Sequence, residues 1–179
     1  MSEDGIIRTD RMRFTKNTLS SRLALAGIAF NVLFFVSIYK VNHSAYYTYW
    51  MGISIIYNLV FMLSAFLASE GTKNYKPGYS VLLILLAAGQ IARIFIYPAR
   101  MRANPEIEGP ALILVKTVVT EANGVVVTEE TTKELLSQYV RVVAYLSLSA
   151  ACLLAGAVIN LYRSRVLAAH KAGLGLQKA

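Results

Sequence analysis

The sequence predicts an all-α membrane protein with four transmembrane helices, and two observations lead to this class. Four long apolar stretches together contain one formally charged residue, Arg93. Each stretch is close to the ~20 residues with which a helix crosses ~30 Å of hydrocarbon. Hydrophobic residues make up 56% of the chain and charged residues only 16%, whereas a soluble domain has about 25% charged residues. The predicted spans cover residues 23–39, 46–68, 79–97 and 142–162.

The distribution of Lys and Arg predicts that both termini lie in the cytoplasm. Eleven of these residues fall in the tail 1–22, the turn after the second span and the tail 163–179, against six in the other connections. Cations in short connections favour the cytoplasmic side. The tail 1–22 also lacks the apolar core of a signal peptide. We therefore predict two cytoplasmic tails and an extracytoplasmic loop at 98–141, with the C-terminal tail continuing as a helix through Lys171.

The net charge of +8 raises the question of a polyanionic partner. The cations sit in tails and turns beside the spans, where the anionic head groups of the lipid bilayer account for them. This placement argues against nucleic acid as a partner.

The loop between the third and fourth spans predicts a β-hairpin at about 111–132. Two β-prone runs flank Asn123 and Gly124, and Asn-Gly is the pair that a type I′ turn favours. An isolated two-stranded ribbon is marginal in water, so we expect it to dock on a copy of itself, another subunit or the membrane surface. A flexible loop is the alternative, and residues 132–139 look helical. The residues expected to form the interaction surface are Val115, Val118, Val119, Asn123, Gly124, Val126 and Val127.

The spans lack the residues on which several kinds of membrane chemistry depend. The two histidines, His43 and His170, lie outside the spans, and no Asp or Glu occurs within any of them. Histidine-ligated haem, a di-iron site and a carboxylate proton relay are therefore disfavoured. The sequence predicts no catalytic, cofactor-binding or metal-binding residues, and we expect no enzyme.

Four polar residues within the spans are the candidate site. Asn31 and Asn58 lie near the midpoints of the first two spans, which a tight turn makes neighbours, so an interhelical hydrogen bond is favoured over a midplane ligand site. Gln90 and Arg93 share a face of the third span. Arg93 lies close enough to the end of the span for its head to snorkel to the surface, which is the favoured interpretation. An ion pair with a loop or partner acid and a transport role are the alternatives.

Small residues at helical spacing predict close packing of the third and fourth spans. These residues are Ala88, Ala92, Ser147, Ala151, Ala155 and Gly156. The spacing leaves open whether the two spans pack on each other or on another chain.

Two functions of different classes follow from these patterns. The favoured one is a non-catalytic integral membrane subunit of a larger complex or homo-oligomer, with other membrane subunits or copies of itself as partners. The alternative is a small oligomeric channel or transporter that uses the intramembrane Asn, Gln and Arg residues.

Overall fold

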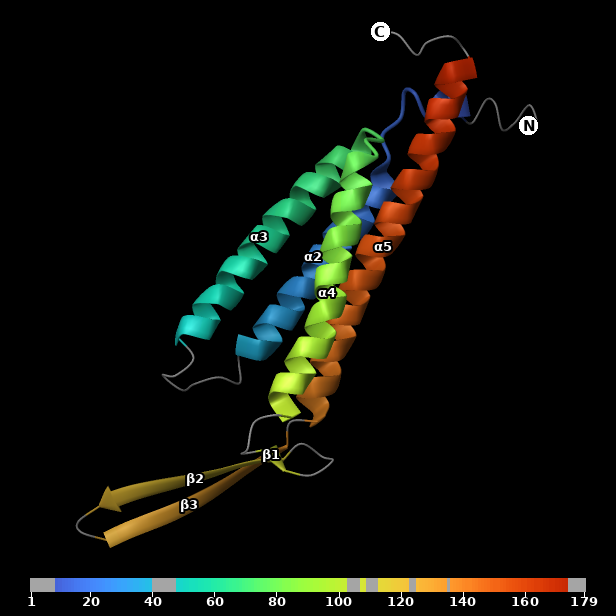
Figure 1. The fold of residues 1–179 in the computed structure, drawn as a ribbon. Helices are drawn as coiled ribbons and strands as arrows, with labels where there is room; N and C mark the ends of the chain where they lie inside the picture. The colour runs from blue at the N-terminus through green and yellow to red at the C-terminus, as the bar shows by residue number, and fades with distance from the viewer. Residues whose placement is uncertain are drawn as a thin grey trace.

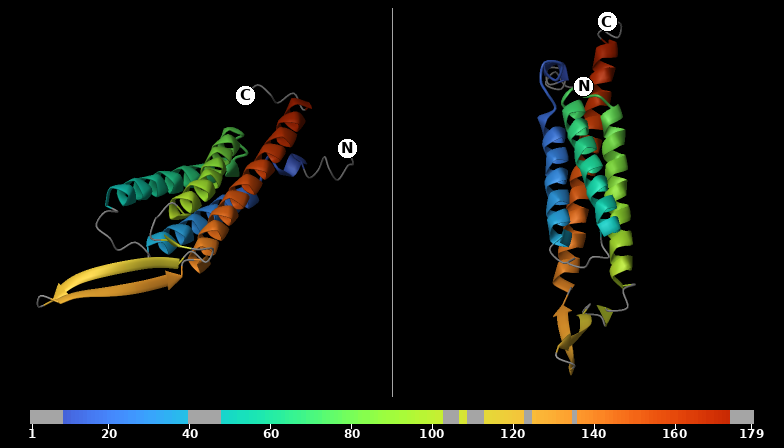
Figure 2. Two further views of the ribbon diagram at one scale, coloured as in Figure 1. Left: turned by 60° about the horizontal axis from the view of Figure 1, so that its bottom comes forward. Right: turned by 90° about the vertical axis from the view of Figure 1, so that its left-hand side faces the viewer.

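The computed structural model describes residues 9–39, 48–102, 107–108, 113–122, 125–134 and 136–173. Four helices lie side by side as an antiparallel bundle (Figure 1) and extend along a common direction (Figure 2). Each is long and apolar enough to cross a membrane. The prediction of four membrane-spanning segments is confirmed at this level. The helices are α2 (Thr18–Tyr39), α3 (Thr48–Lys73), α4 (Gly78–Arg102) and α5 (Leu136–Gly173).

Two helices run further than their predicted spans. Helix α4 continues through Pro98 to Arg102, because a proline inside a membrane helix removes one backbone donor without ending the helix. Helix α5 has 38 residues, about 57 Å at the rise of an α-helix. It therefore extends beyond a ~30 Å hydrocarbon core, and it includes the predicted helical part of the C-terminal tail.

The predicted fold class is wrong in its β part. The described chain has a three-stranded antiparallel sheet, in the order β1-β2-β3. The prediction was an all-α protein with a two-stranded ribbon at 111–132. The strands are β1 (Ile107–Glu108), β2 (Ile113–Ala122) and β3 (Val125–Glu134). Strand β3 ends where Ile113 pairs with Glu134, so the helix expected at 132–139 begins only at Leu136. The sheet projects from the end of the bundle opposite the start of α2 (Figure 1).

Small side chains let α2 and α5 approach each other closely. The Ser149 hydroxyl donates to the Gly27 carbonyl oxygen at 2.8 Å. The Ser20 hydroxyl donates to the Gly156 carbonyl oxygen. A Cβ atom on Gly156 would lie 3.1 Å from the Ser20 carbonyl oxygen. The buried apolar core beside this contact is rich in alanine; it comprises Ala24, Phe61, Ala65, Ala68, Leu83, Ala87, Leu153 and Ala157.

The predicted packing residues lie mostly on the outside of the bundle. Gly156 is buried, but the other five are exposed at the surface of the chain: Ala88, Ala92, Ser147, Ala151 and Ala155. Small residues occur on several faces of these helices, and the inward face of α5 uses Ser149, Ala150 and Ala157 instead. Five of the six predicted residues therefore do not pack within this chain, and the alternative that they pack on another chain stays a prediction.

Gly71 offers a direct test of the α3–α4 packing. A Cβ atom at this position would lie 2.1 Å from Cδ2 of the Tyr79 ring. We expect Gly71→Ala to lower the free energy of unfolding by about 1–3 kcal/mol through overpacking, measured by thermal unfolding in a mild detergent. The matched control is Gly52→Ala in the same helix, where a Cβ meets nothing within 4 Å. The control should be neutral or stabilising by up to ~1 kcal/mol; equal melting temperatures for the two variants would contradict the packing.

Candidate functional site

The four intramembrane polar residues predicted from the sequence come together in one cluster. Asn31 comes from α2, Asn58 from α3, and Gln90 and Arg93 from successive turns of α4. Asn31, Asn58 and Gln90 are buried, and Arg93 is partly buried. We call these four residues the Arg93 cluster. It joins three of the four helices on the side of the bundle nearer the sheet.

Asn31 is the residue through which the Arg93 cluster is connected. Its Nδ2 donates to Asn58 Oδ1 at 3.0 Å. Its Oδ1 accepts from Gln90 Nε2 at 2.9 Å and from Arg93 Nη1 at 3.2 Å. A carboxamide oxygen has two lone pairs, so the Asn31 oxygen is fully used by these two donors.

Asn58, which lies in α3, completes the network. Its Oδ1 accepts from Arg93 Nη1 at 3.2 Å as well as from Asn31. Its Nδ2 donates to the Ser54 carbonyl oxygen one turn earlier in α3, at 2.7 Å. The guanidinium is therefore held by oxygens from two helices, and both amide groups have partners for donor and acceptor.

Two aromatic rings flank the guanidinium of Arg93. Its Cζ atom lies 4.4 Å from the centroid of the Phe34 ring and 4.7 Å from that of Tyr57. A cation over an aromatic face gains ~0.5–2 kcal/mol, and more when water is excluded. Gly89 leaves room for this arrangement, because a Cβ there would lie 2.9 Å from the Tyr57 hydroxyl.

These contacts show that the snorkelling interpretation of Arg93 is wrong. The side chain is directed toward α2 and α3, where amide oxygens and ring faces replace the head-group region. A snorkelling side chain reaches for water when the surrounding helices give it no acceptor, and here Asn31 and Asn58 supply acceptors. The alternative of an ion pair with a loop acid concerns Glu106 and Glu108, the acids that follow α4 in the sequence. Glu106 lies outside the described residues, and nothing is described of the Glu108 side chain.

The positive charge of Arg93 is stabilised by uncharged groups, namely amide oxygens and aromatic ring faces. Across the four helices the one acidic residue is Glu70, near the other end of α3 and bound to Lys73. Among the described residues, Gln90 Oε1 is the one buried side-chain N or O atom without a hydrogen-bond partner. The same part of the chain holds no group of three His, Cys, Asp or Glu placed to bind a metal. The cluster can join helices, and its cation can interact favourably with a dipole or an anion. Its four residues include no acid–base pair.

A second polar cluster, which the sequence interpretation missed, lies at the end where α2 begins. Asn17 Nδ2 donates to Asn160 Oδ1 at 3.1 Å, and Arg163 Nη1 donates to Asn17 Oδ1 at 2.8 Å. Asn160 Nδ2 donates in turn to Ser80 Oγ at 2.8 Å. Asn160 is an uncharged polar residue inside the predicted fourth span, so a search of that span for amides would have found it. Phe34 and Tyr57 gave no comparable signal, because aromatic residues are common in apolar helices.

The remaining predicted residues belong to the sheet. Val115, Val118 and Val119 lie in β2, and Val126 and Val127 lie in β3. Nothing is described of their side chains, and Asn123 and Gly124 lie outside the described residues. The expected docking of this segment stays a prediction.

Comparison with protein-family models, with curated proteins and with solved structures finds no match to this chain.

The central place of Asn31 predicts a large effect of its removal. Asn31→Ala deletes three interhelical hydrogen bonds, each worth ~0.6 kcal/mol on average in a membrane protein, so we expect a loss of about 2 kcal/mol. The measurement is unfolding in a mild detergent. The control on the same helix is Ser37→Ala, because the Ser37 hydroxyl donates only to Leu33 of α2 among the described contacts. A similar small effect for both variants would show that the cluster does not hold the helices together.

Proposed function

We propose that this protein is a non-catalytic integral membrane subunit that assembles with other subunits or with copies of itself. The observation that carries the proposal is the outward position of the small residues on α4 and α5. Ser147, Ala151 and Ala155 are four residues apart along α5 and all are exposed. Together they leave a shallow strip without large side chains on the membrane-facing surface of the chain.

Such a strip suits the docking of another helix. Small residues spaced by four let two helix backbones approach closely, and van der Waals packing then drives association without a hydrophobic effect. The strip is flanked on α5 by large exposed side chains, Leu148 and Val158, which can pack around a docked helix. The proposed contact therefore offers close backbone approach at its centre and apolar packing at its edges.

Helix α4 presents a similar surface. Ala88 and Ala92 are exposed, and Leu85 and Phe95 on the same side are 64% and 72% exposed. Residues three, four and seven positions apart share one face of a helix. This alternation of small and large residues supports α4 as a second contact surface for assembly.

The Arg93 cluster supports assembly over the channel alternative. A polar pathway needs groups that are available to a passing ion or solute. The donors of Asn31, Asn58 and Gln90 are instead directed at acceptors within the chain. The cluster in this arrangement acts between the helices of one chain.

The test of the proposal is a mass measurement on the intact protein purified in a mild detergent. We expect copies or other chains in fixed ratio with it, and we expect Ala151→Phe to weaken this association about tenfold or more, which corresponds to ~1.4 kcal/mol. A phenylalanine at this exposed position fills the strip and contacts none of the buried core.

The matched control is Val60→Phe, at a position on α3 that is also exposed and lies outside the proposed contact surfaces. The control should keep the mass of the wild-type assembly. A wild-type protein that purifies as a single chain would contradict the proposal. A ring of this chain alone that conducts ions after reconstitution would favour the channel.

A further inference from the structure

A pocket of about 210 Å³ lies at the end of the bundle that carries the second polar cluster. Three separate parts of the chain form it: the segment before α2, the turn between α3 and α4, and the last turns of α5. The pocket is close to the ends of α3 and α4, whereas α5 continues past them (Figure 1). This position corresponds to the region where hydrocarbon gives way to head groups.

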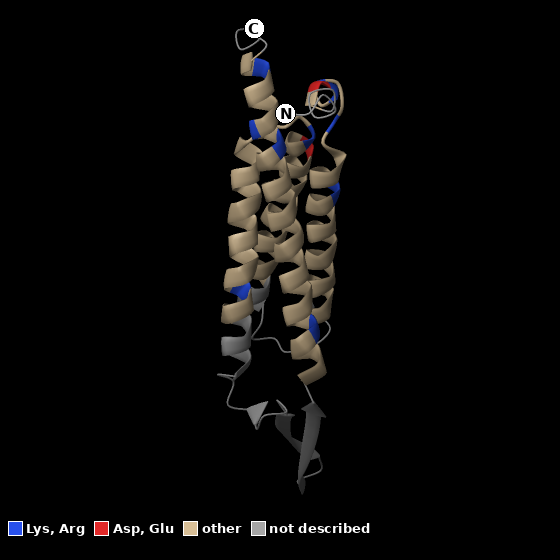
Figure 3. Cartoon of the chain, turned by 90° about the vertical axis from the view of Figure 1, so that its right-hand side faces the viewer, with Lys and Arg blue, Asp and Glu red and all other residues tan. Residues whose placement is uncertain are grey.

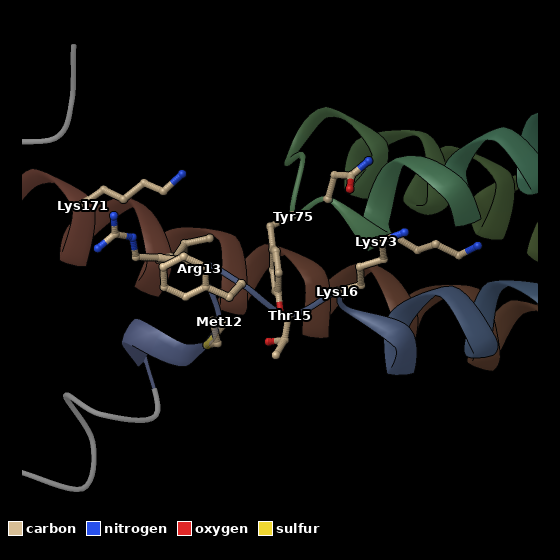
Figure 4. Close-up of a pocket in the computed structure, with 10 residues that line it drawn as sticks. Met12, Arg13, Thr15, Lys16, Lys73, Tyr75 and Lys171 are labelled. Carbon is tan, nitrogen blue, oxygen red and sulfur yellow. The ribbon is translucent and has the colours of Figure 1, made fainter. Parts of the chain in front are cut away.

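Four cationic side chains line this pocket: Arg13, Lys16, Lys73 and Lys171. In the view of Figure 4, Arg13 and Lys171 lie on one side of Tyr75, and Lys16 and Lys73 lie on the other. Cationic side chains from three parts of the chain thus line the same pocket, with their charged ends on the two sides of the Tyr75 ring in this view. We call this site the basic pocket.

Nearby acids neutralise only part of this charge. Arg13 pairs with Asp10 at 3.0 Å, and Lys73 pairs with Glu70. Hydrogen bonds from Arg13 and His170 lower the pKa of Asp10, so Asp10 stays an anion at neutral pH. Lys16 and Lys171 form no ion pair with any described residue. The described residues 9–22, 70–80 and 160–173 hold nine Lys or Arg and two acids, and the cations gather at this end in Figure 3.

The turn between α3 and α4 places an aromatic ring within the basic pocket. Tyr75 has a φ of 55°, a left-handed conformation that residues with a side chain rarely adopt. Two backbone hydrogen bonds hold the turn. The Asn74 N–H donates to the Gly71 carbonyl oxygen, and the Tyr75 N–H donates to the Thr72 carbonyl oxygen. In Figure 4 the ring of Tyr75 lies between the two pairs of cations.

Apolar side chains surround the same pocket. Phe14 lines it and is 81% exposed, and Leu167 on α5 is buried beneath it. An exposed phenylalanine beside cations is unfavourable in water but favourable at a membrane interface, where the ring meets lipid and the cations meet head groups. The basic pocket is therefore adapted to a ligand that is both anionic and anchored in the bilayer.

We infer that the basic pocket binds the phosphate group of an anionic membrane lipid. Lys16 and Lys171 supply positive charge without an ion pair among the described residues, one on each side of Tyr75. The guanidinium of Arg13 has further planar N–H donors for phosphate oxygens beside its bond to Asp10, and Phe14 is exposed to contact the apolar part of the lipid. This inference is independent of the proposed assembly, because it concerns a different surface of the molecule.

The experiment uses the full chain in a mild detergent and short-chain phosphatidic acid as the probe, with bound lipid measured by native mass spectrometry. We expect wild-type protein to bind phosphatidic acid at least tenfold more tightly than phosphatidylcholine of the same chain length. The double variant Lys16→Gln/Lys171→Gln should weaken phosphatidic acid binding roughly 10- to 30-fold, as expected when two interfacial cations are removed.

The matched control is Lys76→Gln/Arg165→Gln, which removes the same charge from the same end of the bundle without altering the lining of the pocket. It should change the affinity less than threefold or so. An equal loss in the control would overturn the inference, because binding would then depend on the overall charge of this end. Equal affinity for the two lipids, or displacement of phosphatidic acid by an equal concentration of inorganic phosphate, would also overturn it.

Discussion

A guanidinium charge inside an apolar bundle is the constraint on which the arrangement of three helices depends. Arg93 extends from α4 toward α2 and α3, where the described residues include no acid near it, so its charge is met by neutral groups. Asn31 and Asn58 provide carboxamide oxygens from α2 and α3, and Phe34 provides a ring face. Because these groups must all reach one guanidinium, the axial positions of the three helices are fixed together. Helix α5 is held by its close contact with α2 and by the hydrogen bond of Asn160 to Ser80 in α4.

The polar residues of the spans lie mostly inside the bundle, so its outer surface is largely apolar. The shape and charge of this surface then determine the possible partners. The membrane-facing surfaces of α4 and α5 alternate small and large apolar residues, which suits helix packing. The end near Lys73 and Lys171 carries an excess of cations beside exposed apolar side chains, which suits phospholipid. The proposed association in the plane of the membrane and the proposed lipid binding at its edge therefore concern separate surfaces, both away from the Arg93 cluster.

The sequence predicted the features that depend on long or local patterns. Four apolar stretches predicted four helices, and the short turn between the first two predicted that Asn31 and Asn58 would meet. The direction of Arg93 could not be predicted, because snorkelling and inward bonding differ only in which acceptors are within reach. Which face of α5 packs inside the chain could not be predicted from spacing, because small residues such as Ala150 and Ala151 occur on adjacent positions that point in different directions. Strand β1 has two residues, too few for any alternation to appear in the sequence.

A double-mutant cycle between Asn31 and Arg93 tests the central role of this cluster most directly. The free energy of unfolding is measured in a mild detergent for the wild type, Asn31→Ala, Arg93→Met and the double variant. Direct bonding between the two side chains predicts a coupling energy of about 1–2 kcal/mol. A coupling within about 0.3 kcal/mol of zero would show that Arg93 does not depend on Asn31, and would contradict the account of how the helices are held together.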